Sequence, residues 1–552
     1  MVERRYRMAM AALLWASTVC VAFGLGEAIS LAAEPLRQVI DQRVSAAWQI
    51  QGISPAQPAS DAEFLRRVSL DLVGEIPTYD EMVAFLADVD ADKRAKLIDR
   101  LLDDPRYASH QADLWDMVLF GRNPPGYDTD KRDGIQQWLR EQFASNRPYD
   151  EWVRELLLAR GNSVEQGPPL YYQQYRNQPE DLTEVVTQTF LGVQLQCARC
   201  HDHPFESWTQ TDFYGMAAFF ARLEMVTVGK KDNLTMYALG EKSTGDVLFT
   251  GPAKDQEPGR KGEPVKPHFL LGNSLDEPEL PSDFKEVKFE NNKPPQPPHF
   301  SRKDQLAEWV TAEDNPFFAR AIANRLWAQY FGRGLVHPID NMTESNPASH
   351  PELLAEMTDW LKQQRFDLKG FVRELLNSNT YQLSTAGGSG DALPTWFQHA
   401  RSRPLSAEEL VASWRIATGY ANTEQGQKEM AKGERYRPLT SGYVLQFFGQ
   451  PNNGVGDFQG GLHEHLYLNN GQLGSVITDA PGSLLNLLTQ ADVPAEQRAE
   501  RLFLQMLNRP ATDAERQKLV EWLSTTDSRE LRERSQQAIW ALMTCSEFRF
   551  NH

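Results

Sequence analysis

The chain has 552 residues, of which 41% are hydrophobic and 10% aromatic. This length and composition suffice for two or three domains with buried cores and exclude a largely disordered protein. Acidic residues exceed basic ones, 75 to 57, for a formal net charge of -18, which argues against nucleic acid as a partner.

The N-terminus has the order of residues typical of a signal peptide. Arginines stand before residue 8, an uncharged and mostly apolar run covers residues 8–25, and small residues surround Ala32 and Ala33. We therefore predict a signal peptide over residues 1–33, cleaved near Ala32 or Ala33, with an uncleaved anchor as the alternative. The mature protein would then be periplasmic or secreted. No later segment approaches the roughly 20 apolar residues that a membrane-spanning helix needs, so we expect no membrane span after cleavage.

The pattern of residues 34–225 predicts an N-terminal helical domain. Apolar positions between residues 61 and 102 recur at helical spacing, with turns at Gly74 and Pro77. Apolar positions over 182–195 suit another helix, which would deliver a cysteine motif at its end. A further helix should begin directly after that motif.

The densest chemical stretch of the chain lies between these last two helices, at residues 196–205, with the sequence QCARCHDHPF. Cys197, Cys200 and His201 form the Cys-x-x-Cys-His pattern of c-type haem attachment. Two thiols about one helical turn apart can add to the two vinyl groups of a haem, and the adjoining imidazole can ligate the iron. We therefore expect one covalent haem c on Cys197 and Cys200, with His201 as proximal ligand.

Two other interpretations of this motif stay open. A Cys-x-x-Cys pair also suits a disulfide or half of a metal site. A zinc or iron centre would use His201 and His203 and would need distant ligands, because the remaining cysteine of the mature chain, Cys545, is isolated in the sequence. The candidates are thus haem c, a zinc or iron centre, and a structural cysteine pair.

Residues 226–303 differ in composition from what precedes them. Short runs that favour strands, such as Thr235–Leu239, lie among many prolines, including Pro294, Pro295, Pro297 and Pro298. This pattern predicts a β-rich insert followed by a proline-rich linker. A C-terminal helical domain over residues 304–552 should follow.

The C-terminal domain repeats short motifs of the N-terminal domain in the same order. The matched pieces are Leu114-Trp115 with Leu326-Trp327, Phe120-Gly121 with Phe331-Gly332, Trp138-Leu139 with Trp360-Leu361, Tyr149-Asp150 with Phe366-Asp367, and Val153-Arg154-Glu155-Leu156-Leu157 with Val372-Arg373-Glu374-Leu375-Leu376. We therefore predict a mainly α fold of two related multi-helix modules, with the small β-rich, proline-rich insert between them. Trp115 and Trp327 should occupy equivalent core positions.

A weaker echo links the two ends of the chain. Residues 64–85 resemble residues 502–523, and in both segments a threonine stands three residues before a glutamate, as Thr78 does before Glu81 and Thr512 before Glu515. Both pairs fit the capping box that begins a helix. If the echo reflects a common origin, the two ends should pack in equivalent positions.

Three side chains near residue 340 invite a catalytic interpretation, namely His337, Asp340 and His350. Local helix chemistry explains the last of them, because Ser349 and Glu352 around it form a capping-box pattern. The chain has neither a Gly-x-Ser-x-Gly elbow nor a His-Glu-x-x-His pair, so hydrolase chemistry has no positive support.

The segment LGVQLQCARCHDHPF at residues 191–205, followed by Trp-Thr-Gln at 208–210, resembles the signature of the planctomycete cytochrome-like domain of unknown function. Residues 315–336 and 349–354 resemble the domain that follows it in the same large secreted proteins. The resemblance covers nearly the whole mature chain. It implies haem attachment at Cys197 and Cys200 and a proximal His201.

These observations predict an exported c-type haem protein for redox chemistry or electron transfer, with a redox partner or extracellular substrate that the sequence does not name. One alternative is a non-haem metal-dependent enzyme that acts on an extracellular substrate. The other is a secreted scaffold or binding protein in which the cysteine pair is structural.

Overall fold

The computed structural model describes residues 34–121, 133–163, 166–176, 178–231, 234–249, 262–431, 444, 448, 462–470 and 472–552. The predicted signal peptide, residues 1–33, lies outside these residues. Within the described part of the chain, no helix is both long enough and apolar enough to cross a membrane.

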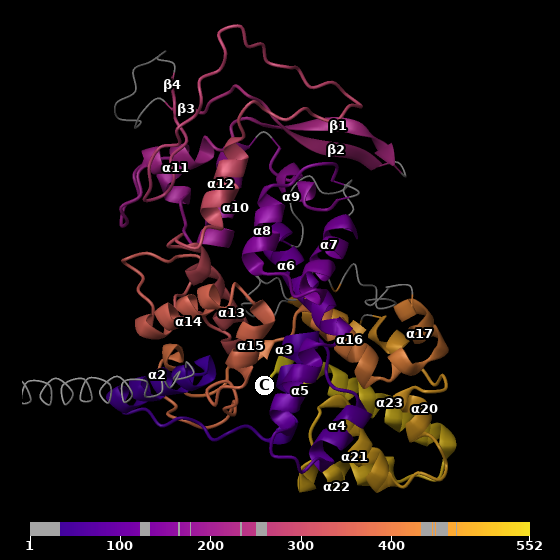
Figure 1. Cartoon of the computed structure of the whole chain (residues 1–552). Helices are drawn as coiled ribbons and strands as arrows, with labels where there is room; N and C mark the ends of the chain where they lie inside the picture. Colours follow the sequence, from indigo (N-terminus) through magenta and orange to yellow (C-terminus); the bar gives the residue numbers. More distant parts are fainter. Residues whose placement is uncertain are drawn as a thin grey trace, which may run out of the picture.

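The protein is mainly α-helical, as the sequence predicted (Figure 1). Helices before the insert are α2 Leu36–Gln51, α3 Asp61–Val73, α4 Tyr79–Ala87, α5 Lys93–Leu102, α6 Pro105–Phe120, α7 Asp133–Ala144, α8 Tyr149–Leu157, α9 Pro169–Gln173, α10 Pro179–Val186 and α11 Gln210–Ala217. Helices after it are α12 Arg302–Val310, α13 Phe318–Phe331, α14 Pro351–Gln363, α15 Leu368–Leu376, α16 Ala407–Ala417, α17 Glu424–Ala431, α19 Leu462–Asn470, α20 Leu484–Leu488, α21 Ala495–Met506, α22 Asp513–Leu523 and α23 Ser528–Thr544.

The predicted insert contains a small β structure. Strands β1 (Leu223–Lys231) and β2 (Leu234–Glu241) pair antiparallel, with an irregularity in register between Thr227 and Gly229. The predicted run Thr235–Leu239 lies inside β2. Two short strands, β3 (Leu248–Phe249) and β4 (Glu263–Pro264), form a second pair. Figure 1 shows the β1/β2 hairpin at one end of the molecule, far from the C-terminal helices α20 to α23.

The repeated motifs correspond to a repeated series of three helices, α6–α7–α8 and α13–α14–α15. The first helix of each series ends at a glycine with positive φ, Gly121 at 63° and Gly332 at 70°. In the first series the Trp138 ring lies 6.0 Å from the Trp152 ring, and in the second the Trp360 ring lies 5.7 Å from the Phe371 ring. The same aromatic contact therefore joins the second and third helices of both modules.

The two tryptophans expected to be equivalent have different neighbours. Trp115 packs on Trp152 with ring centroids 4.9 Å apart, whereas Trp327 stacks on Phe331 of its own helix at 3.8 Å. Trp115 stands five residues before the helix-ending Phe120, and Trp327 stands four before Phe331. One residue rotates a helical side chain by about 100°, so both tryptophans are buried but on different faces. The prediction of equivalent positions for this pair is wrong.

Buried hydrophobic residues form two clusters. The larger extends from Leu36 to Phe397 and includes the cores of both repeated modules together with Leu504. The second joins residues 405–548 with Leu70 and Ile76 from the N-terminal part of the chain. The domain limits at residues 225 and 303 were predicted from changes in amino-acid composition. The hydrophobic core divides at a different place, after Phe397.

The N-terminal helices α3 and α4 pack beside the C-terminal helices. Both predicted capping boxes form, Thr78 with Glu81 at the start of α4 and Thr512 with Glu515 at the start of α22. The Arg501 guanidinium of α21 lies 4.0 Å from the centre of the Tyr79 ring of α4. Figure 1 shows α4 beside α21.

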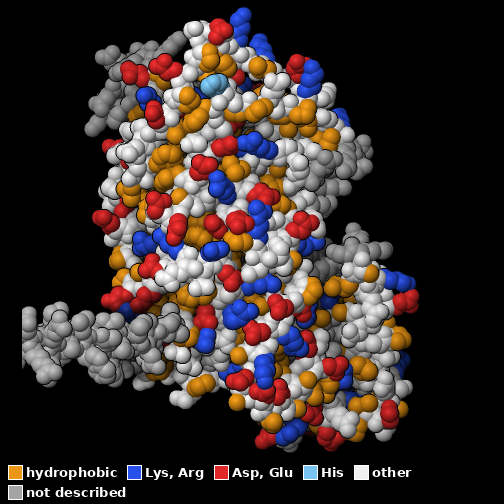
Figure 2. Space-filling model, viewed as in Figure 1, with side chains coloured by type: hydrophobic (Ala, Val, Ile, Leu, Met, Phe, Trp, Pro, Cys, Tyr) orange, Lys and Arg blue, Asp and Glu red, His pale blue; other side chains and the backbone are white. Residues whose placement is uncertain are grey.

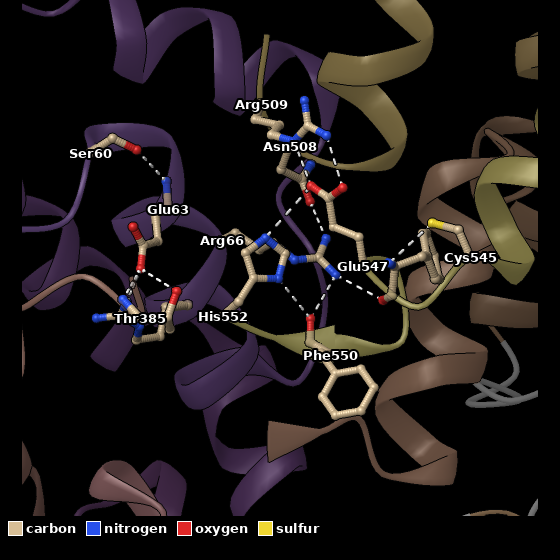
Figure 3. Close-up of polar contacts among 12 residues, drawn as sticks. Ser60, Glu63, Arg66, Thr385, Asn508, Arg509, Cys545, Glu547, Phe550 and His552 are labelled. Carbon is tan, nitrogen blue, oxygen red and sulfur yellow. Dashed lines mark hydrogen bonds and ion pairs between the residues drawn. The ribbon is translucent and has the colours of Figure 1, made fainter. Parts of the chain in front are cut away.

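A buried arginine joins the two ends of the chain. Arg66 of α3 is 1% exposed, and its guanidinium donates to Asn508 Oδ1 at 2.7 Å and to the Phe548 carbonyl at 2.9 Å. It also donates at 3.2 Å to the carbonyl of Phe550 in β6 (Phe550–Asn551), which pairs with β5 (Arg403–Pro404). Figure 3 shows the guanidinium directed at Asn508 and at the Phe550 carbonyl. The C-terminal strand is thus held by an N-terminal side chain.

Candidate functional site

Helix α10 delivers the cysteine motif through a tight change of direction. Its end continues as a π-helical turn over Thr187–Leu191, which stops at Gly192 with φ of 67°. A side chain at that position would be strained by the positive φ, and its Cβ would lie 3.1 Å from Met342 Sδ. The Gly192 carbonyl accepts a 2.9 Å hydrogen bond from the Met342 backbone N–H. Glycine therefore lets the chain turn against the second module.

The two thiols lie on one short helical turn at the surface. A 3-10 turn covers Gln196–Arg199, and the backbone N–H groups of Cys200 and His201 both donate to the Cys197 carbonyl at 3.3 Å. Ala198 between the cysteines is fully buried, whereas both cysteines are exposed and free. The turn therefore directs the two thiols outward on the same side, as the predicted attachment requires.

His201 presents one ring nitrogen for ligation. Its ring is exposed, and Nδ1 lies 2.8 Å from the Asp202 carbonyl oxygen. Because a carbonyl only accepts hydrogen bonds, Nδ1 is the donor in this contact, and the neutral ring keeps its lone pair on Nε2. Ligating histidines usually donate their second ring nitrogen in this way. The ring of His201 fits the predicted proximal ligand.

His203 has a different local role. Its Nδ1 accepts hydrogen bonds from the backbone N–H groups of Phe205 at 3.3 Å and Glu206 at 3.1 Å, and the backbone N–H of His203 donates to the Trp208 carbonyl at 2.8 Å. The neutral ring therefore carries its proton on Nε2, so ligation through Nε2 would break both contacts at Nδ1. The structure gives His203 a capping function in the loop, which does not fit the alternative metal site.

Polar contacts from the next helix hold the loop in place. Asp202 Oδ1 accepts the Gln210 backbone N–H at 3.0 Å, at the start of α11, and the Tyr214 hydroxyl donates to the Arg199 carbonyl at 3.1 Å. The Arg199 side chain pairs with Glu184 of α10 at 3.2 Å. Burial raises the pKa of the Glu184 carboxyl, and the contact with Arg199 opposes this shift. The motif is thus fixed by both flanking helices.

The second module also touches the loop. Gln194 donates to Asp340 Oδ1 at 2.9 Å, and the Ser345 hydroxyl donates to the Glu206 carboxylate. Asp340 therefore supports the segment that leads into the motif. His350 packs with its ring centre 5.8 Å from those of Trp396 and Phe397. The Nδ1 atom of His337 is buried.

An exposed aromatic side chain follows the thiols in the same loop. Phe205 is 83% exposed, although Trp208, three residues later, is buried. Nothing in the sequence indicates that Phe205 is exposed and Trp208 buried, because both are aromatic residues of the same short loop. The motif therefore carries two thiols, the His201 ring and an apolar ring on the surface of one short loop.

In the residues that the structure describes, no group of three or more His, Cys, Asp or Glu side chains is arranged to hold a metal ion. Met216 of α11, the helix that follows the motif, is fully buried in the main core.

Burial of the His350 imidazole should make the stability of the protein depend on pH. It is 5% exposed, and burial lowers the pKa of its imidazole to about 4 from 6.5. Below pH 6.5 the unfolded chain therefore binds a proton that the folded protein does not, so stability falls from pH 6.5 down to about 4. We expect wild type to lose about 2 kcal/mol more than His350→Phe between pH 7.5 and 5. Urea titrations at the two pH values measure this difference.

The exposed His299 supplies the control for this experiment. The variant His299→Asn should lose as much stability between pH 7.5 and 5 as wild type does. Equal losses in wild type and His350→Phe would contradict the prediction.

The fold and the site define a mainly helical protein with a Cys-x-x-Cys-His loop held between two modules. Residues 39–225 match the family model PSCyt2, a protein of unknown function (DUF1549), and residues 302–454 match PSD1, a protein of unknown function (DUF1553). The chain belongs to the family that carries this pair of domains, as the resemblance in the sequence predicted. No curated protein and no solved structure matches the chain.

Proposed function

We propose that the protein is an exported c-type haem protein, with one haem attached to Cys197 and Cys200 and His201 as axial ligand. The observation that carries the proposal is the arrangement of the motif. Two free, exposed thiols lie on one helical turn, and the next residue has a ring whose Nδ1 is held by a backbone carbonyl. A haem bound there would supply one-electron redox chemistry.

The residues of the chain have distinct tasks in this proposal. Cys197 and Cys200 would attach the macrocycle through thioether bonds, and His201, whose Nδ1 is held by the Asp202 carbonyl, would ligate the iron through Nε2. The bond from Gln210 to Asp202 fixes that backbone. Phe205 adds an apolar ring next to the attachment site, where it can cover part of a haem edge.

The distribution of charged side chains bears on the kind of redox partner that the protein would have. On the face drawn in Figure 2, basic and acidic side chains are interspersed. Figure 2 therefore gives no reason to assign a strongly charged redox partner. The partner or substrate is expected among extracellular molecules, consistent with the predicted signal peptide.

The test is production of the full chain in a host with c-type maturation machinery. We expect haem that stays with the protein through acid-acetone extraction, because thioether bonds are covalent. The double variant Cys197→Ala, Cys200→Ala should carry no haem, while Cys545→Ala, at the isolated third cysteine, should carry as much as wild type. Absorption spectra and intact mass measure both outcomes.

The two histidines separate haem ligation from a metal site. His201→Ala should keep the covalent haem but change its absorption spectrum, because the axial ligand is lost, whereas His203→Ala should leave the spectrum as in wild type. A colourless protein with stoichiometric zinc or iron would overturn the proposal in favour of the metal-dependent enzyme. A colourless, metal-free protein with a Cys197–Cys200 disulfide would favour the scaffold.

A further inference from the structure

A cavity lies beside the β1/β2 hairpin, apart from the cysteine motif. Its volume is about 450 Å³, and it is bounded by the hairpin, by the prolines of residues 294–298 and by residues 160–162. Much of its wall is apolar, with Val228, Met236 and Leu239 contributed by the hairpin. The size and lining are those of a small-molecule site rather than of a packing defect.

One lysine lines this otherwise largely apolar cavity. Lys303, the second residue of α12, is 4% exposed, and its Nζ donates to the Ala159 carbonyl at 2.9 Å. No acidic side chain in the described part of the chain forms an ion pair with it. Glu241, which also lines the cavity, is engaged by the Ser301 hydroxyl at 2.5 Å and by the Lys303 backbone N–H at 3.2 Å. Lys303 therefore has donor capacity left.

A buried ammonium without a paired carboxylate is costly. Burial lowers the pKa of Lys303 to about 8, which the charges of Glu241 and Asp304 oppose. The side chain is thus mostly protonated at neutral pH. At the rim, Arg160 is exposed and pairs with Asp304 at 2.7 Å. Two basic side chains, Lys303 and Arg160, and one acidic side chain, Glu241, line the cavity. Lys303 has no ion-pair partner among the described residues, so it is the group with which an anionic ligand would pair.

We propose that the cavity binds a small amphipathic carboxylate, whose anionic group pairs with Lys303 Nζ and whose apolar chain lies against the hairpin and the prolines. Binding would supply the counter-ion that Lys303 lacks. The apolar walls would remove the chain of the ligand from water. This site is independent of the cysteine motif and of the proposed haem.

The test compares two ligands with the same tail, octanoate and octanol, by calorimetric titration of the full chain. We expect octanoate to bind at least about tenfold more tightly than octanol, because only the carboxylate pairs with Lys303. In Lys303→Met, which keeps an apolar side chain of similar length, the two affinities should become equal. In Met236→Trp, which fills the cavity, both ligands should lose affinity while Lys303 is unchanged.

A pH series provides an independent readout. The groups around Lys303 are Arg160 after α8, Tyr172 of α9, Glu241 of β2 and Asp304 of α12. Octanoate affinity should fall as pH rises above about 8, where Lys303 loses its proton, and octanol affinity should stay constant. Glu241→Gln should keep this trend and Lys303→Met should remove it. Equal affinities in wild type, or a preference for octanoate that survives Lys303→Met, would overturn the proposal.

Discussion

Replacement of Arg66 by methionine should lower the free energy of unfolding by about 3–5 kcal/mol. The substitution leaves the carbonyls of Phe548 and Phe550 and the Asn508 side chain without their donor in a buried site. Burial lowers the pKa of Arg66 to about 10, so the guanidinium is charged at neutral pH and its hydrogen bonds are charge-assisted. Urea titration followed by circular dichroism measures the loss.

The matched control is the same substitution at an exposed arginine. Arg529, whose side chain is 87% exposed, pairs with Glu533 one helical turn away, and exposed pairs of this kind contribute at most a few tenths of a kcal/mol. Arg529→Met should therefore change the stability by less than about 0.5 kcal/mol. A loss for Arg66→Met no larger than this would show that the two ends of the chain are held together by other contacts.

Replacement of Trp152 by alanine should cost a similar amount, about 3–5 kcal/mol. Trp152 is 1% exposed and its ring contacts those of Trp115, Trp138 and Tyr149 at 4.9–6.0 Å. Truncation removes the ring on which these three aromatic side chains pack. Thermal and urea unfolding measure the change.

The second module supplies the comparison for Trp152. It has Phe371 at the corresponding position, in contact with Trp360 as Trp152 is with Trp138. We therefore expect Trp152→Phe to cost only about 1–2 kcal/mol, because a phenyl ring preserves the same kind of contact. A cost for Trp152→Phe equal to that for Trp152→Ala would argue against a shared aromatic framework in the two modules.

Much of the helical structure could be predicted from local chemistry. The capping boxes of Thr78 and Thr512, and the burial of Val153, Leu156 and Leu157 in the repeated motif, depend on residues within one or two turns. The Leu-Trp motif does not show that Trp115 and Trp327 lie on different faces of their helices. Their different distances from the common Phe-Gly helix end do show it, because position along a helix sets the direction of a side chain.

The sequence pattern indicates which residues make up the candidate site but not how they are arranged. Spacing alone indicated Cys197, Cys200 and His201, because the pattern is local. The capping role of His203 depends on which ring nitrogen faces the backbone of Phe205 and Glu206, which no spacing rule gives. The cavity beside Lys303 could not be predicted either, since its walls come from three separate segments spread over residues 160–303.

The hydrogen bond from Arg66 to the Phe548 carbonyl connects residues 482 positions apart. This separation limits how early the Arg66 site can form during folding. Until the segment around Phe548 has been synthesised, the Arg66 guanidinium has none of its carbonyl acceptors and favours water over the interior. Leu70 and Ile76 lie close to Arg66 in the sequence. Until residues 405–548 are synthesised, they too lack the hydrophobic cluster in which they are buried. Contacts of such long range slow folding. The amino-terminal half should therefore stay incompletely folded during synthesis, a state compatible with translocation as an unfolded chain.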